Sequence, residues 1–335
     1  MRRRVLTGAA SSLALVPFAA RALSATSSIW DTIGESEPKE DQGDSVEPAN
    51  GETLLLSVGV ELNGKGPLTF VVDTGADRTV IADDLVDAYG MTLGARVLVD
   101  GIIRSTHTDT ALVSRMRFGS AERRDFWVAT LPRQMLKADG ILGLDVLDGR
   151  KITFDFKRHL LTIGAPRPYF SIAWTGEREE RVRARGDSGH LRSIDCFVDG
   201  VRATAFIDSG AEVSACNSSL FAALKSRNAA QGTSGSVLLS GVTGGKVEGT
   251  LTPVDKIQLQ ELSWTNCALV VADFEIFKIW GLKRTPALLI GMNLLRSFAR
   301  VAIDYRRKEI SFELTNSRVT QPPTFARLNS RAGGA

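Results

Sequence analysis

Cysteine and histidine are scarce in this chain, which holds three of each among 335 residues. Cys196, Cys216 and Cys267 match no zinc-ligand spacing and form no CxxC pair, so neither a zinc site nor a dithiol redox site is indicated. An odd number of cysteines argues against a disulfide framework and leaves two interpretations open: buried free thiols, or one bridge formed after export. No Ser-His-Asp or Cys-His arrangement and no phosphate-binding G-x-x-x-x-G-K-S/T segment can be singled out. We therefore predict no metal ion and no organic cofactor.

An excess of charge of one sign is also lacking. The 41 Lys and Arg residues nearly balance the 38 Asp and Glu residues, so the net charge is only +3 and gives no reason to expect a nucleic-acid partner. The hydrophobic content of 43% is typical of a soluble protein that buries a core. At about 150 residues per domain, the length predicts two domains.

Long apolar runs are absent as well, and the one short run lies near the N-terminus. A basic start (MRRRVLTG), an apolar stretch broken by Pro17 and small residues after it are typical of an export signal. We predict a signal peptide over residues 1–25 and a periplasmic or secreted protein that is not stably inserted in a membrane after signal removal. The RRRVL segment is similar to a twin-arginine signal, while the general secretory route and a retained basic tail remain alternatives.

The segment that follows is acidic and poor in apolar residues. Residues 26–50 hold seven acids and one lysine, and such a segment cannot bury enough surface to offset its chain entropy. We predict a disordered linker there, with a removed pro-segment as the alternative.

What the chain does contain is an internal repeat. FVVDTGADRTVI (70–81) and AFIDSGAEVSAC (205–216) each place an aspartate, a hydroxyl residue, a glycine and an alanine directly behind an apolar strand. Each motif follows an expected β-hairpin, with its turn at 63–64 or 199–200. Each precedes an expected short helix, for which Asp83 and Asn217 are the predicted N-caps.

The remaining elements repeat in the same order. Each half continues with a glycine-containing hairpin, an apolar strand that ends at Gly143 or Gly291 before a short helical turn, and a final hairpin at 151–163 or 300–312. This order predicts an all-β chain of two related lobes with short helices. The predicted boundaries are an N-terminal lobe at 51–164, an interlobe linker at 165–190, a C-terminal lobe at 191–315 and a flexible tail at 316–335.

The pattern resembles the retroviral-type (retropepsin-like) aspartic proteases. The resemblance is carried by VVDTGAD with GILGLDVL and by FIDSGAE with LLIGMNLL, and it covers roughly 54–164 and 191–315. It implies two β-barrel lobes related by a pseudo-twofold axis and hydrolysis of a protein or peptide substrate. Viral members use two identical chains, whereas this chain supplies both halves and is expected to act as a monomeric, intramolecular pseudo-dimer. A catalytically silent peptide-binding protein of the same fold is the alternative.

The resemblance implies a catalytic pair, Asp73 and Asp208, one from each lobe. Two neighbouring carboxyls cannot both ionise, so they share one proton, and one activates a water while the other polarises the carbonyl. The small residues support this pair: the glycines allow a tight turn in which N–H groups approach the carboxylates, and by resemblance the hydroxyls tie the two loops together. These supporting residues are Thr74, Gly75, Ala76, Ser209, Gly210 and Ala211.

The resemblance also implies substrate contacts. Asp77 and Glu212 occupy the position where the family contacts the substrate backbone, and the glycine-containing hairpins look like flaps that close over a peptide. The expected flap glycines are Gly101, Gly241, Gly244 and Gly245. The apolar strand that ends at Gly143 or Gly291 is the second glycine motif of its half. The viral pattern has an arginine directly after this glycine, where this chain has Leu144 and Met292. Bracing between the lobes must therefore differ from that in the viral proteins.

Overall fold

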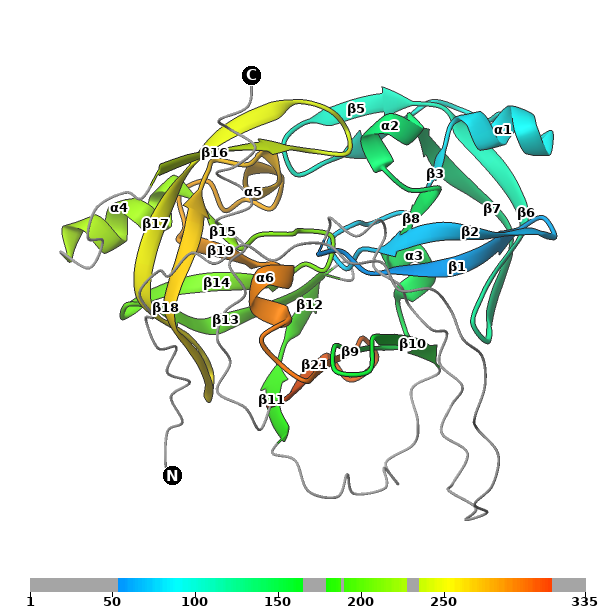
Figure 1. Ribbon diagram of the computed structural model, residues 1–335. Coiled ribbons are helices and arrows are strands. Elements are labelled where there is room, and N and C mark those ends of the chain that lie inside the picture. Colours follow the sequence, from blue (N-terminus) through cyan, green and yellow to red (C-terminus); the bar gives the residue numbers. More distant parts are fainter. Residues whose placement is uncertain (1–53, 165–178, 188–189, 228–234, 315–335) are drawn as a thin grey trace, which may run out of the picture.

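The computed structural model describes residues 54–164, 179–187, 190–227 and 235–314. The predicted signal peptide, acidic linker and C-terminal tail lie outside these residues. In the described part of the chain, we find no helix that is both long and apolar enough to cross a membrane. Strands dominate the fold, as predicted (Figure 1).

Six strands of the first half close a barrel in the order β1-β2-β8-β3-β7-β6. The elements of this half are β1 (Ser57–Leu62), β2 (Lys65–Val72), β3 (Val80–Ala82), α1 (Asp84–Tyr89), β4 (Val97–Asp100), β5 (Ser105–Thr108), β6 (Thr110–Phe118), β7 (Ala121–Leu131), α2 (Arg133–Leu136), β8 (Gly140–Leu142), α3 (Leu144–Leu147), β9 (Lys151–Asp155) and β10 (Leu160–Gly164).

The second half repeats this circuit. Its elements are β13 (His190–Val198), β14 (Val201–Ile207), β15 (Ala215–Cys216), α4 (Ser218–Ser226), β16 (Gly235–Ser240), β17 (Lys246–Leu259), β18 (Leu262–Val271), α5 (Glu275–Ile279), β19 (Ala287–Ile290), α6 (Met292–Leu295), β20 (Arg300–Asp304) and β21 (Glu309–Glu313). The sheet order β13-β14-β19-β15-β18-β17 is closed by an additional pairing of β13 with β17. Strand by strand this is the order of the first barrel, so the predicted duplication is confirmed.

Local sequence explains why the corresponding elements form. The turns between β1 and β2 and between β13 and β14 have positive φ at both central residues, 51° and 80° at Asn63-Gly64 and 45° and 77° at Asp199-Gly200. This is the type I′ geometry that asparagine, aspartate and glycine favour in two-residue hairpins. The predicted N-caps are confirmed, because the Asp83 carboxylate accepts from the backbone N–H of Asp84 and the Asn217 side chain accepts from that of Leu220.

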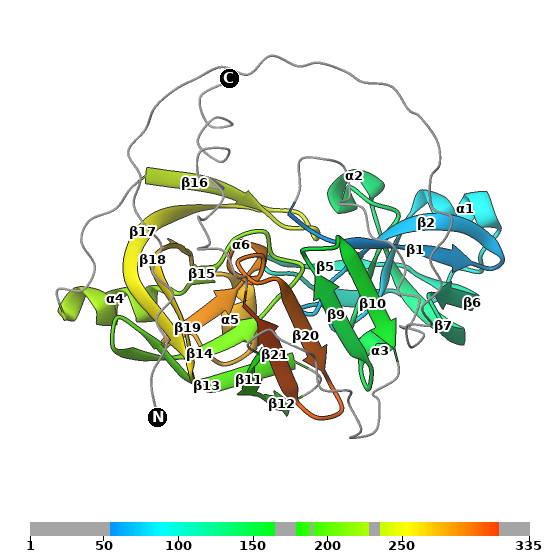
Figure 2. The ribbon, with the colours of Figure 1, turned by 60° about the horizontal axis from the view of Figure 1, so that its bottom comes forward.

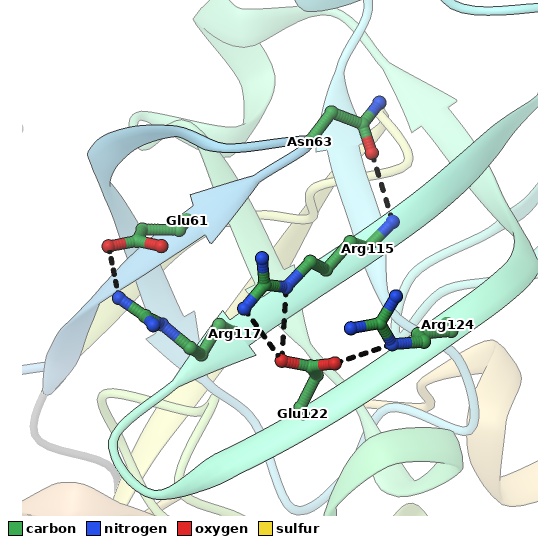
Figure 3. Close-up of polar contacts among 6 residues, drawn as sticks. All are labelled: Glu61, Asn63, Arg115, Arg117, Glu122 and Arg124. Atoms are coloured by element: carbon green, nitrogen blue, oxygen red, sulfur yellow. Dashed lines mark hydrogen bonds and ion pairs between the residues drawn. The ribbon is translucent and has the colours of Figure 1, made fainter.

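Exposed ion pairs connect three strands of the first barrel (Figure 3). Arg117 on β6 forms an ion pair with Glu61 on β1, and Glu122 on β7 forms ion pairs with both Arg115 and Arg124. The Asn63 side chain accepts from the backbone N–H of Arg115, which ties the first hairpin turn to β6. Pairs this exposed contribute little individually to stability, but they match the register of the three strands.

A five-stranded sheet joins the two lobes (Figure 2). The final hairpin of each half contributes two strands, and β9 of the first lobe pairs antiparallel with β20 of the second. Asp155 and Arg300, both largely buried, form an ion pair of 2.7 Å across this junction. The fifth strand is β11 (Glu179–Arg183), which pairs with β21, while β12 (Arg185–Asp187) pairs with β13. The predicted interlobe linker thus contains two strands.

The main hydrophobic core runs through both lobes and the sheet that joins them. Its largest fully buried side chains include Phe70 and Phe118 of the first lobe, Phe298 of the second, and Phe154 and Phe312 of the shared sheet. All three cysteines are buried and none of them forms a disulfide, and burial raises the pKa of the Cys196 and Cys216 thiols to about 12. Such thiols are unreactive, which agrees with the interpretation of buried free thiols.

Candidate active site

The two repeated turns meet between the lobes. Asp73 follows β2 and Asp208 follows β14, and each of these strands runs parallel to the strand that ends in the second glycine motif, β8 or β19. The backbone N–H of Asp73 donates to Leu142 (3.1 Å), and that of Asp208 donates to Ile290 (3.0 Å). Each aspartate therefore directly follows a buried pair of parallel strands, and this pair fixes the position of its backbone.

Hydroxyl groups tie the two turns together, as the resemblance implied. Thr74 Oγ1 donates to the carbonyl of Ile207 (3.2 Å) and accepts from the backbone N–H of Ser209 (2.9 Å). Ser209 Oγ donates to the carbonyl of Val72 (2.8 Å) and accepts from the backbone N–H of Thr74 (3.1 Å). These four reciprocal bonds are buried, so neither turn can shift without breaking bonds that connect it to the other.

The glycine of each turn lies against the carboxyl of the other. The N–H of Gly75 donates to Asp73 Oδ1 and that of Gly210 donates to Asp208 Oδ1, each at 2.8 Å. A β-carbon on Gly210 would lie 2.2 Å from Asp73 Cγ, and one on Gly75 would lie 2.6 Å from Asp208 Cγ. No side chain larger than hydrogen fits at either place while the two carboxyls stay where they are.

Both carboxyls have perturbed acidity. Burial raises the pKa of Asp73 above its ordinary value, against backbone N–H donors and the nearby His190, which lower it. Burial and then the negative charge of Asp73 raise the pKa of Asp208 well above its ordinary value. The two carboxyls also hydrogen-bond to one another, so they titrate as a pair.

A polar buttress supports the first turn from behind. The Asp145 carboxylate accepts from the N–H and the hydroxyl of Thr79 (2.8 and 2.7 Å), and Thr79 Oγ1 accepts from the N–H of Gly143. The N–H of Leu144 donates to the carbonyl of Ala76, and the Leu144 side chain is buried where the viral pattern has arginine.

The second turn has the same buttress with an amide in place of the acid. The Asn293 side-chain oxygen accepts from the N–H and the hydroxyl of Ser214 (2.8 and 2.7 Å), and Ser214 Oγ accepts from the N–H of Gly291. The N–H of Met292 donates to the carbonyl of Ala211. Both glycine motifs therefore pack behind the turns.

Asp77 and Glu212, the predicted substrate contacts, have different surroundings. Asp77 Oδ1 lies 2.8 Å from Nε2 of His190, a histidine of the other lobe that is nearly buried and packs against Trp280. Glu212 is half-buried and lies close enough to Arg296 to favour the charge of that guanidinium. The pseudo-twofold symmetry is thus broken within four residues of the two aspartates.

The predicted flaps also face each other. The hairpins β4–β5 and β16–β17 meet above the centre of the molecule (Figure 1). Arg104 Nε donates to the carbonyl of Thr243 (3.0 Å), and Thr243 Oγ1 donates to the carbonyl of Arg104 (2.6 Å). The carbonyl of Ile102 accepts from the N–H of Ile276 in α5. The flap tips are therefore connected to each other and to the second lobe.

The four predicted flap glycines all lie at this junction. Gly101 approaches Thr243, Gly241 and Gly245 approach Ile103, and Gly244 approaches the Arg104 guanidinium. Their predicted contact with substrate stays a prediction.

Several residues of the site were not predicted. Thr79 and Ser214 each lie six positions after the aspartate of their turn, a repeat that the sequence does contain. Tyr305 is buried close to Thr74 and both aspartates, and burial raises its pKa. His190 carries no recognisable signal, because a single histidine at the start of a strand looks the same whether it packs in a core or reaches a carboxylate. No group of three or more potential metal ligands occurs in the part of the chain that the structure describes.

A known protein family matches both halves of the chain. The model of a family described as Aspartyl protease matches residues 58–146 and 194–294, which together make up more than half of the chain. Each match contains one aspartate turn and the glycine motif that supports it. A search of curated proteins found no match. With two family matches on two repeated barrels, the chain belongs to the aspartyl protease family, in the retropepsin-like form with both lobes in one chain.

Proposed function

We propose that the protein is an aspartic endopeptidase whose catalytic pair is Asp73 and Asp208. The observation that carries this proposal is the crossed contact between the turns, in which the glycine of each lobe makes room for the carboxyl of the other. The raised pKa of both carboxyls supports it, because a pair that shares one proton supplies an acid and a base together.

The expected reaction uses both protonation states. The Asp73 carboxylate takes a proton from a water whose oxygen attacks the peptide carbonyl carbon, and the protonated Asp208 gives its proton to the carbonyl oxygen. Collapse of the resulting tetrahedral diol breaks the carbon–nitrogen bond, as the pair returns one proton to the leaving nitrogen and takes one from a hydroxyl. The rigid turns hold the carboxyls in place through these steps, which reduces the reorganisation that the reaction requires.

The proposed reaction also requires that a substrate reach the aspartate pair. The connected flaps must part to admit an extended peptide and close to exclude water, and Asp77 and Glu212 are proposed to contact the peptide backbone.

The chain is proposed to work as a monomer. It is proposed to work outside the cytoplasm, because its first 25 residues have the pattern of an export signal. Mass spectrometry should then find a mature N-terminus after residues 22–25, and an intact leader on a cytoplasmic protein would contradict this.

The test of catalysis compares Asp73→Asn, Asp208→Asn and the double variant, each lacking residues 1–50, on an unfolded protein substrate at acidic pH. Each single change should abolish cleavage, and the double variant should be no worse, because residues that act as a unit are not additive. A statine-type inhibitor should block the wild type. Substantial activity in either single variant would overturn the shared-proton mechanism. Peptide binding without cleavage by the wild type would favour the catalytically silent alternative.

A further inference from the structure

A hollow on the first lobe is lined in part by residues that follow the turn of Asp73. Its volume is about 680 Å³, and it is lined by Asp77, Arg78, Arg123, Phe126, Trp127 and Asp145. Asp77 comes four residues after Asp73, and its partner His190 lies close enough to Asp73 to lower the pKa of that carboxyl. A peptide bound at the pair would therefore pass the mouth of this hollow.

All but one of the charged side chains that line the hollow make polar contacts within the described residues. Asp77 is bonded to His190. Asp145 accepts from Thr79, and the Arg123 guanidinium donates to the backbone carbonyl of Asp145. Arg78 is exposed and, within the described ranges of the chain, makes no hydrogen bond or ion pair. One guanidinium is thus available to an incoming group.

The wall next to this cation is aromatic. Trp127 is 46% exposed, an unusual fraction for the largest apolar side chain, and Arg123 lies 4.4 Å above the ring of the buried Phe126. An apolar surface beside a free guanidinium suits a side chain that has methylene groups and ends in a carboxylate. The planar fork of arginine can bind both oxygens of such a group.

The second lobe has an apolar residue where the first lobe has Arg78. The position that corresponds to Arg78, five residues after the aspartate, is Val213, which is buried in an apolar cluster. Selection by charge is therefore restricted to the side of the scissile bond that the first lobe contacts.

We propose that this hollow is a substrate subsite that selects an acidic side chain, glutamate above all, and that Arg78 is its specificity-determining residue. This rests on the proposed endopeptidase function, whose substrate class it narrows to peptides with an acidic residue on one side of the cleaved bond.

The experiment uses peptides that carry Glu, Gln or Lys at one position at a time, from the fourth residue before the cleaved bond to the fourth after it. Wild type, Arg78→Glu and Arg306→Glu are compared by kcat/KM at low salt. Arg306 is a matched control, because it is exposed, has no ion pair in the described residues and lies in the turn between β20 and β21. Equilibrium binding of the same peptides to Asp73→Asn separates the subsite from catalysis.

The wild type should favour Glu over Gln by about two- to fivefold at positions on one side only, as expected for one exposed ion pair. Arg78→Glu should reverse the order of Glu and Lys there, Arg306→Glu should leave it unchanged, and added salt should weaken it. An unchanged Glu-to-Lys ratio in Arg78→Glu, or equal preferences on both sides, would overturn the proposal. If no peptide is cleaved, the endopeptidase function fails, and the binding ratio still decides on the subsite.

Discussion

Replacing Gly210 with alanine should nearly abolish activity while leaving the fold intact. The added β-carbon would lie 2.2 Å from Asp73 Cγ, about 1.2 Å closer than the 3.4 Å at which ordinary contact begins. Asp73 cannot simply turn aside, because the N–H groups of Gly75 and Ala76 hold its carboxylate. The Gly210 backbone cannot retreat either, because the neighbouring Ser209 is bonded across the lobes.

The pair must therefore separate by about 1 Å. A misplacement of this size costs on the order of 100-fold in rate when the reacting groups must be aligned. In Gly75→Ala the β-carbon would lie 2.6 Å from Asp208 Cγ, so the forced displacement is about 0.8 Å and the loss should be smaller. The order of the two variants is thus part of the prediction.

The assay is kcat/KM on one peptide, with thermal unfolding of each variant as the measure of folding. Gly59→Ala is the control, because its β-carbon would meet only Pro67, at 3.3 Å, far from the pair. More than a tenth of wild-type activity in a folded Gly210→Ala variant would refute the crossed contact between the turns, and so would a greater loss in Gly75→Ala.

Three further changes test other parts of the site. Asp208→Asn should raise Tm at pH 7, because burial raises the pKa of the Asp208 carboxyl and the native state therefore loses stability as the pH rises through that raised pKa. The gain in Tm should vanish below about pH 3.8, where the carboxyl is protonated in both the folded and the unfolded state. A gain that stays constant with pH would contradict this. Ala211→Ser adds a donor that favours the charged pair, so both limbs of the kcat/KM profile should move toward acid by up to about one pH unit, and unmoved limbs would argue against the hydroxyl. Arg104→Gln removes the guanidinium that bonds to Thr243, so flap opening measured by hydrogen exchange should become about two- to tenfold faster, while unchanged exchange would show that the contact does not hold the tips together.

Local signals in the sequence predicted the framework of the fold and the pair of aspartates. The turns at 63–64 and 199–200, the caps Asp83 and Asn217, and the apolar strand before each aspartate depend on neighbours in the chain, so short segments specify them. Repetition then converted two weak motifs into one strong prediction.

The parts that could not be predicted depend on pairings between distant residues. His190 and Asp77 are 113 positions apart, and Arg104 and Thr243 are 139 apart, so nothing near either member indicates its partner. The sequence of strand β11, EERVR, is almost entirely charged and predicts a linker. It is a strand because the edge of the five-stranded sheet supplies backbone partners and needs only Val182 to be buried.

The sheet that joins β9 to β20 has a consequence for how the protein responds to dilution. In a two-chain protease the active site exists only as long as the subunits stay associated, so specific activity falls at low concentration. Here both aspartates lie on one chain, and the junction sealed by Asp155 and Arg300 forms at an effective concentration that dilution cannot change. A single molecule in a large volume would therefore keep both aspartates of the pair together.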